Sequence, residues 1–212
     1  MGTARRAEIP AHDPLASSFA GVLHSAGPHP ELAPKLKLYG WLVGHWDFDV
    51  TTFTDDGMLH VGRGEIHAGW VLEGRAIQDV WMIPTLADRR PGVAQMPGAG
   101  NWFGTTLRIY DPHLDAWHIL WSDPATGFFS RQVGRARGGD IVQEGPDPRG
   151  GKMRWTFNEI DADSFHWMAE HSVDSFHWRK IVDIRARRAQ YIEPIRPEMI
   201  YAQRQADQLH MV

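Results

Sequence analysis

Polar side chains beside tryptophans are the first candidates for chemistry in this sequence. The segment RAIQDVWMIP contains Asp79, which shares a face with Trp81 if the segment is a β-strand. A carboxylate inside a Trp-lined interior is suited to general acid or base work, because desolvation perturbs the pKa of ionisable groups. Two other interpretations remain: Asp79 is a structural hydrogen-bond acceptor, or it points outward while Val80 and Met82 face the core.

A second candidate is a carboxylate–imidazole pair. In GRGEIHAGW, Glu65 and His67 share one strand face, whereas Ile66 and Trp70 share the other. The pair would form a catalytic dyad if it faced inward, but Trp70 on the opposite face favours an outward orientation. The sequence leaves the facing of both segments open, so both Asp79 and His67 are kept as proton-transfer candidates.

The motif DSFHW occurs twice in residues 163–178, eleven positions apart. We expect a hairpin that turns at Val173–Asp174, in which the repeated histidines His166 and His177 are offset by four residues. That offset is about 13 Å along a strand, whereas ligands of one zinc ion each lie about 2 Å from it. The two histidines therefore cannot share a metal. A zinc or iron site from histidines on different strands stays open among the 12 histidines, but no spacing supports it, so we assign no metal ligand.

The same hairpin gives one strand face a row of aromatic side chains. An exposed row would form an apolar patch that soluble monomers rarely carry, so we expect this face to point inward and the histidines of the repeat to be solvated. The inward face would also carry two polar residues that could contact a ligand, of which His171 is a further proton-transfer candidate. Its members are Phe165, Trp167, His171, Phe176, Trp178 and Lys180.

The same argument assigns other aromatic runs to the interior: Trp46, Phe48 and Val50; Trp117, Ile119 and Trp121; Met153, Trp155 and Phe157. Arg108 alternates with Leu107 and Ile109, which favours a solvated arginine. If it faced inward, it would hold a carboxylate or phenolate of a ligand. The candidate ligand-binding residues are therefore Trp81, Arg108, Trp121, Trp155, Trp167, Trp178 and Lys180.

Short β-strands must position these side chains. About ten alternating runs between residues 44 and 188 are separated by turn sequences such as TDDG, DPATG and DPRGG. Sequential strands with tight turns predict an all-β protein, an antiparallel up-and-down barrel that removes its sheet edges by closing. The loop 84–101 is rich in Gly and Pro, and it is either a lid over the barrel or an excursion without a role. Its Arg89 and Arg90 could attract an anionic substrate.

The two ends of the chain are expected to be helical. Residues 1–43 would form an N-terminal arm with short capping helices, 44–188 the barrel, and 189–212 a C-terminal helical tail. The apolar stripe from Met199 to Leu209 could cap this barrel or a neighbouring copy, which would make a homodimer.

Composition limits the class of protein. The chain has 212 residues, no cysteine and a net charge of −4 with histidines neutral. The length is typical of one large domain, and the lack of cysteine excludes disulfides, thiolate metal sites and a cysteine nucleophile. No basic stripe indicates a nucleic-acid partner, and neither a signal sequence nor a membrane span is visible. We therefore expect a cytoplasmic protein whose partner is a small molecule.

The chain resembles the lipocalin-like (calycin) superfamily. Gly44-His45-Trp46 in LVGHWDFDV is similar to the G-x-W of the first calycin strand, and GRAIQDVW, GTTLRIYDP and the final ARR are similar to bacterial lipocalin-like barrels of unknown function. The resemblance covers roughly residues 38–188. It implies a cavity for a small, mostly apolar ligand, with Trp46 plugging the closed end and Arg188 stacked on Trp46.

Two functions from different classes follow. The first is binding of a small hydrophobic, aromatic or polycyclic metabolite inside the barrel. The second is a cofactor-free lyase, isomerase or cyclase that uses Asp79 or a histidine for proton transfer. A weaker alternative, drawn from similar ten-stranded barrels, is haem binding through His171; no other cofactor is indicated.

Overall fold

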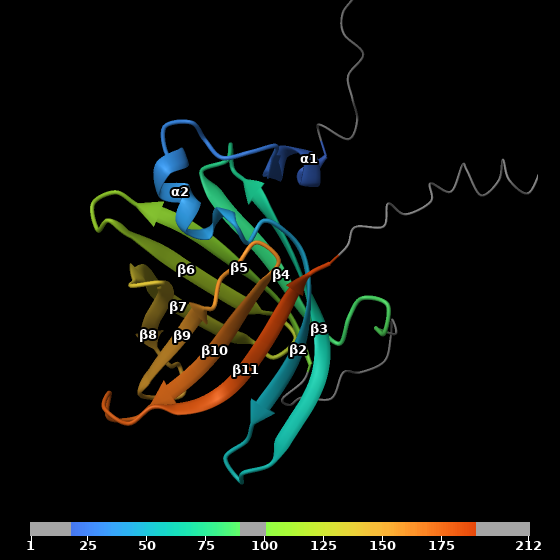
Figure 1. The fold of residues 1–212 in the computed structure, drawn as a ribbon, viewed down its shortest axis with the longest axis vertical. Helices are drawn as coiled ribbons and strands as arrows, with labels where there is room; N and C mark the ends of the chain where they lie inside the picture. The colour runs from blue at the N-terminus through green and yellow to red at the C-terminus, as the bar shows by residue number, and fades with distance from the viewer. Residues whose placement is uncertain (1–17, 90–100, 190–212) are drawn as a thin grey trace, which may run out of the picture.

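The computed structural model describes residues 18–89 and 101–189, and its core is an antiparallel barrel of ten strands (Figure 1). The strands are β2 (Gly44–Phe53), β3 (Leu59–Val71), β4 (Ala76–Ile83), β5 (Trp102–Asp111), β6 (Ala116–Asp123), β7 (Phe128–Arg137), β8 (Asp140–Pro146), β9 (Lys152–Asn158), β10 (Ser164–Ser172) and β11 (Arg179–Arg188). The predicted up-and-down barrel is thus confirmed.

Two pairings, one between the first and last barrel strands and one between consecutive strands, complete the barrel. β11 pairs with β2, and β3 pairs with β4 in addition to β2, so the sheet returns on itself. The short strand β1 (His24–Ser25) only extends one margin by pairing with β3. Closure leaves the ten barrel strands paired on both sides, so that their inner faces share one interior.

Helices cover one end of the barrel. α1 (Phe19–Leu23) begins after Ser18, whose hydroxyl accepts the Gly21 N–H, and α2 (Ala33–Gly40) lies across the end of the barrel (Figure 1). Leu36 and Tyr39 of α2 are fully buried in the barrel core. The predicted N-terminal helices therefore exist, whereas the predicted C-terminal helix lies outside the described residues. None of the helices within 18–89 and 101–189 is long and apolar enough to cross a membrane.

The strand faces predicted to point inward do so in three of the aromatic runs. Trp46, Phe48 and Val50, then Trp117, Ile119 and Trp121, then Met153, Trp155 and Phe157 are all buried in one core cluster. Ile77 and Trp81 of β4 also belong to this cluster. The pattern of bulky apolar side chains at every second position thus predicted the inward strand face correctly.

The β10–β11 hairpin corrects the predicted register. The connection is a six-residue loop, 173–178, rather than a tight turn, and Phe165 pairs with Ala186. Phe176 is consequently 84% exposed, and Trp178 lies in the loop instead of the inner wall. The loop is longer because its side chains hydrogen-bond its own backbone: Asp174 accepts the N–H groups of Phe176 and His177, and Ser172 accepts that of Ser175.

The two histidines of the repeat also differ from each other. The His177 side chain is exposed, as predicted, and its bond to Asp174 holds the pKa of that carboxyl below its ordinary value. His166 is only 5% exposed, which corrects the expectation of a solvated residue. Its Nε2 lies 2.9 Å from Oδ1 of Asp183 on the neighbouring strand, so an ion-pair partner covers it on the outer face.

The helix-covered end of the barrel is sealed by Trp46 and Arg188. The Arg188 guanidinium carbon lies 4.0 Å from the Trp46 ring centroid, as the family resemblance implied. The same guanidinium donates to the carbonyls of Trp41 (2.9 Å), Val43 (3.1 Å) and Ala162 (3.0 Å). Arg188 therefore ties the last strand to the segment that enters the first strand of the barrel.

We predict that Arg188→Met lowers the free energy of unfolding by about 2 kcal/mol, because it removes a cation–π contact and hydrogen bonds from a charged donor. Urea denaturation followed by circular dichroism measures this, with Arg187→Met, at an exposed neighbouring position, as the matched control. Equal unfolding midpoints for the two variants would show that Arg188 does not seal the barrel.

Candidate ligand-binding site

A cavity of about 770 Å³ occupies the end of the barrel opposite α2. Most of its walls are aromatic or aliphatic, and a few charged groups are placed among them. The lining residues are Thr52, Phe53, Thr54, Asp55, Trp81, Trp102, Thr106, Arg108, Trp121, Asp123, Thr126, Phe128, Arg149, Met153, Trp155, Trp167, Ala169, His171, Arg179, Ile181 and Val182.

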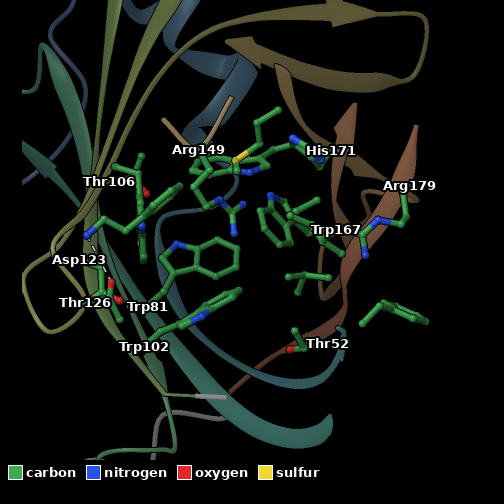
Figure 2. A pocket seen from close by; sticks show the side chains of 18 of the residues that line it. Thr52, Trp81, Trp102, Thr106, Asp123, Thr126, Arg149, Trp167, His171 and Arg179 are labelled. Atoms are coloured by element: carbon green, nitrogen blue, oxygen red, sulfur yellow. Dashed lines mark hydrogen bonds between the residues drawn. The ribbon is translucent and has the colours of Figure 1, made fainter. Parts of the chain in front are cut away.

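Five tryptophans lie around this space: four of them form a closed circuit of ring contacts, and Trp81 joins it through Trp167. Trp167 contacts Trp81 at 5.3 Å and Trp155 at 5.7 Å between ring centroids. Trp155 continues to Trp121 at 6.4 Å, Trp121 to Trp102 at 6.3 Å, and Trp102 returns to Trp167 at 6.4 Å. The five rings come from five strands, β4, β5, β6, β9 and β10. Figure 2 shows Trp81, Trp102 and Trp167 around the common space.

An ion pair forms the floor of the cavity. Arg108 is 2% exposed and donates to Oδ2 of Asp79, while the Thr106 N–H donates to Oδ1 of Asp79 at 3.1 Å. Arg108 and Thr106 line the cavity, whereas Asp79 lies behind them. Two buried opposite charges that also hydrogen-bond compensate each other's loss of water, which explains why an arginine is stable among aromatic rings.

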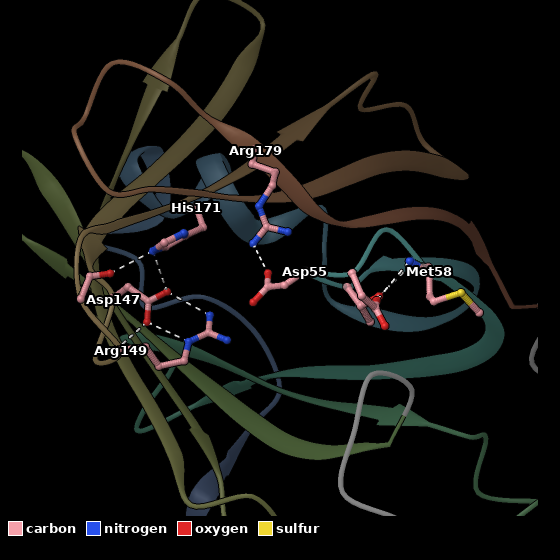
Figure 3. A network of polar contacts seen from close by, with 9 residues as sticks. Asp55, Met58, Asp147, Arg149, His171 and Arg179 are labelled. Atoms are coloured by element: carbon pink, nitrogen blue, oxygen red, sulfur yellow. Dashed lines mark hydrogen bonds and ion pairs between the residues drawn. The ribbon is translucent and has the colours of Figure 1, made fainter.

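A second charged group lies at the mouth. Asp147 has a fully buried side chain and binds Arg149 through both oxygens, with Arg149 Nη2 2.9 Å from Oδ2 (Figure 3). His171 Nε2 is 2.9 Å from the Gly150 carbonyl and 3.7 Å from Oδ2 of Asp147. Burial alone would raise the pKa of Asp147, but its hydrogen bonds with Arg149 hold that pKa below the ordinary value. The carboxylate thus stays charged and keeps Arg149 over the cavity.

The structure brings six of the predicted site residues to the cavity. Trp81, Arg108, Trp121, Trp155, Trp167 and His171 all line it. For Arg108 the structure corrects the expectation of a solvated side chain: its apolar neighbours Leu107 and Ile109 are half-buried on the outer face.

The other four predicted residues do not line the cavity. Asp79 is buried behind Arg108, and both of its oxygens already accept hydrogen bonds. His67 lies on the outer face, 3.3 Å from Glu65, with its ring tilted against that of His45 at 4.3 Å between centroids. Lys180 binds Asp183 on the outer face, and Trp178 packs on Arg154, whose guanidinium carbon is 4.0 Å from the ring centroid. The tight turn expected from the sequence would place Lys180 and Trp178 on the inward face.

Sequence reasoning missed Trp102, Arg149 and Arg179 as lining residues. Trp102 is the first residue of β5, directly after a long loop, where alternation alone gives little information on facing. Arg149 belongs to the DPRGG segment, which has the composition of a turn. Arg179 is the first residue of β11 and binds Asp55 of the β2–β3 turn (Figure 3). A signal was available only for Arg149, because an arginine two residues after an aspartate can bind it across a tight turn.

The contacts of His171 bear on the haem alternative. Within 18–89 and 101–189 no group of three or more His, Asp or Glu side chains could hold a metal ion. A carbonyl oxygen only accepts hydrogen bonds, so His171 Nε2 donates to Gly150 and is not free to bind iron. His171 as it lies therefore does not fit the role of a haem ligand.

Comparisons with known proteins identify the fold. No family model matches the chain, and no curated protein matches it either. The solved structure of Rv2717c from M. tuberculosis is similar, with a TM-score of 0.50 and 14% identity, covering 74% of this chain and 98% of that one. The S-type phycobiliprotein lyase CPES from Guillardia theta has a TM-score of 0.50 and 10% identity, covering 77% and 99%. These neighbours and the ten-stranded barrel fit a lipocalin-like (calycin) fold.

The wall around Trp121 gives a prediction about packing. A Cβ atom added at Gly104 would lie 2.4 Å from a ring carbon of Trp121 and 2.7 Å from the Ser122 carbonyl oxygen. We expect Gly104→Ala to displace the Trp121 indole and to lower the free energy of unfolding by about 1–3 kcal/mol. Near-ultraviolet circular dichroism and urea denaturation measure the two effects.

The matched control is Gly69→Ala in β3, because a Cβ atom there meets nothing within 4 Å. We expect that variant to unfold within about 0.5 kcal/mol of the parent. If both variants behave alike, close packing of Trp121 on Gly104 is not part of the wall.

Proposed function

We propose that this protein binds a small hydrophobic, aromatic or polycyclic metabolite inside the barrel. The observation that carries the proposal is the group of five indoles, four of them in a closed circuit of ring contacts, around a cavity of about 770 Å³. Ligand cavities of about 300–1,000 Å³ typically have apolar walls and a few polar groups that set orientation. Arg108, Thr106 and His171 provide such groups here.

The arrangement of the rings favours a planar ligand. Indole faces and edges can stack on a flat ring system from several directions, and each aromatic contact contributes about 0.5–1.5 kcal/mol beyond its buried area. Trp121, Trp155 and Trp167 remain 6–8% exposed. A ligand that filled the cavity would remove this apolar surface from water.

Membership of the bacterial lipocalin-like barrels of unknown function is part of the proposal. Its support is local: the Gly44-His45-Trp46 segment begins β2, and Arg188 stacks on Trp46 at the sealed end. These features explain the stability of the barrel and do not select a ligand.

We expect Trp167→Ala to weaken binding of N-phenyl-1-naphthylamine at least about fivefold, because Trp167 contacts three of the other four rings. Titration followed by probe fluorescence gives the dissociation constant. Trp178→Ala is the matched control: it also removes an indole, but one outside the cavity, so its affinity should stay within about twofold. Equal losses in both variants, or no binding by the parent protein, would contradict the proposal.

A second candidate is a cofactor-free lyase, isomerase or cyclase. Two observations favour it: a similar barrel is named a phycobiliprotein lyase, and His171 lines the cavity near the Asp147 carboxylate. His171 is better placed than Asp79 for proton transfer, because Asp79 is occupied by Arg108 and Thr106. The His67 imidazole, on the outer face, is not part of this proposal.

Mass spectrometry of the small molecule that co-purifies with the protein separates the two functions. If the protein is an enzyme, the identified compound or its precursor should change chemically with the parent protein and at least about 100-fold more slowly with His171→Asn. A compound recovered unchanged indicates binding alone. Asp79→Asn with full turnover would exclude Asp79 as a base, whereas its loss of turnover would not prove the role, because Arg108 would be left unpaired.

A further inference from the structure

The cavity floor carries hydrogen-bond donors without acceptors. Arg108 and Trp81 line the cavity and are 2% and 3% exposed. The Arg108 Nε and Trp81 Nε1 atoms are buried and have no hydrogen-bond partner in the part of the chain that the structure describes. Both nitrogens can only donate. A buried donor without an acceptor carries a free-energy penalty that a ligand acceptor would remove.

Both oxygens of the Asp79 carboxylate are already used. Asp79 directs one oxygen to the Thr106 N–H and the other to Arg108. Its carboxylate also balances the charge of Arg108, so the floor has no net charge but still has unsatisfied N–H groups. The missing partner is therefore an acceptor rather than a second cation or an aliphatic group.

The two donors belong to the same region of the floor. Trp81 is two residues from Asp79 on the inner face of β4, and Asp79 pairs with Thr106 on β5. Both side chains lie near Phe157: the Trp81 ring centroid is 6.5 Å from that of Phe157, and the Arg108 guanidinium carbon is 5.9 Å from it. Arg108 and Trp81 therefore both lie on the Phe157 side of the cavity.

We infer that the ligand binds with a carbonyl or carboxylate oxygen directed to the floor, where it accepts hydrogen bonds from Arg108 and Trp81. Its aromatic body then lies between Trp102, Trp121, Trp155 and Trp167. This inference rests on the proposed binding function and narrows it to aromatic compounds that carry such an oxygen. Arg108 and Trp81 become the residues that determine specificity.

Three probes with one ring system test the inference: 2-naphthoate, 2-naphthamide and 2-methylnaphthalene, titrated against the intrinsic tryptophan fluorescence of the full chain. We expect both oxygen-bearing probes to bind at least about tenfold more tightly than 2-methylnaphthalene, although the latter is the most hydrophobic. If all three bind with similar affinity, the inference is wrong and the binding function stands. If none binds, the binding function itself is overturned, and the inference with it.

Trp81→Phe assigns the preference to the floor, because it removes the indole N–H and keeps an aromatic ring at this position. We expect it to reduce the ratio of the affinities for 2-naphthamide and 2-methylnaphthalene at least threefold. Arg108→Lys keeps the charge that Asp79 needs and removes the Nε–H, and we expect the same direction of change. Trp178→Phe, outside the cavity, should keep the full preference. A preference that survives in both Trp81→Phe and Arg108→Lys would overturn the inference.

Discussion

Seven residue pairs between β3 and β4, from Glu65 opposite Met82 to Val71 opposite Ala76, join the two margins of the sheet. Without these pairs the ten strands would form an open sheet whose concave face is exposed to solvent. With them, each inward side chain has neighbours from across the barrel as well as from adjacent strands. The contact of Trp81 on β4 with Trp167 on β10 exists only because the sheet is closed. Closure therefore creates both the core and the cavity.

The two halves of the interior show what closure permits. Toward α2, the space is filled by Leu36, Tyr39 and Trp46, and the packing there resembles that of any protein core. Toward the other end, the indoles lie around the cavity. Gly104 contributes to this arrangement, since its missing side chain lets the Trp121 ring lie close to the β5 backbone. Small and large residues on facing positions thus decide where the barrel is solid and where it is hollow.

Periodicity made the fold and much of the wall predictable. Alternation of Trp117, Ile119 and Trp121 predicted the inward face directly, because a misassigned strand would expose all three apolar side chains. The facing of Arg108 was not predictable, since it depends on Asp79 from another strand. The hairpin register was not predictable either. The loop is longer because its backbone N–H groups donate hydrogen bonds to the side chains of Asp174 and Ser172. Alternation of apolar residues predicts which strand face points into the barrel. Polar partners distant in sequence determine which charged side chains lie in the interior.

The sealed end has a kinetic consequence. In the described residues, Arg188 and Trp46 close one end together with α2, and the cavity lies toward the other end. A competing ligand cannot enter through the sealed end. The bound ligand must therefore dissociate before the next ligand binds. Turnover of occupants would then follow a first-order escape rate that does not rise with the concentration of the competitor.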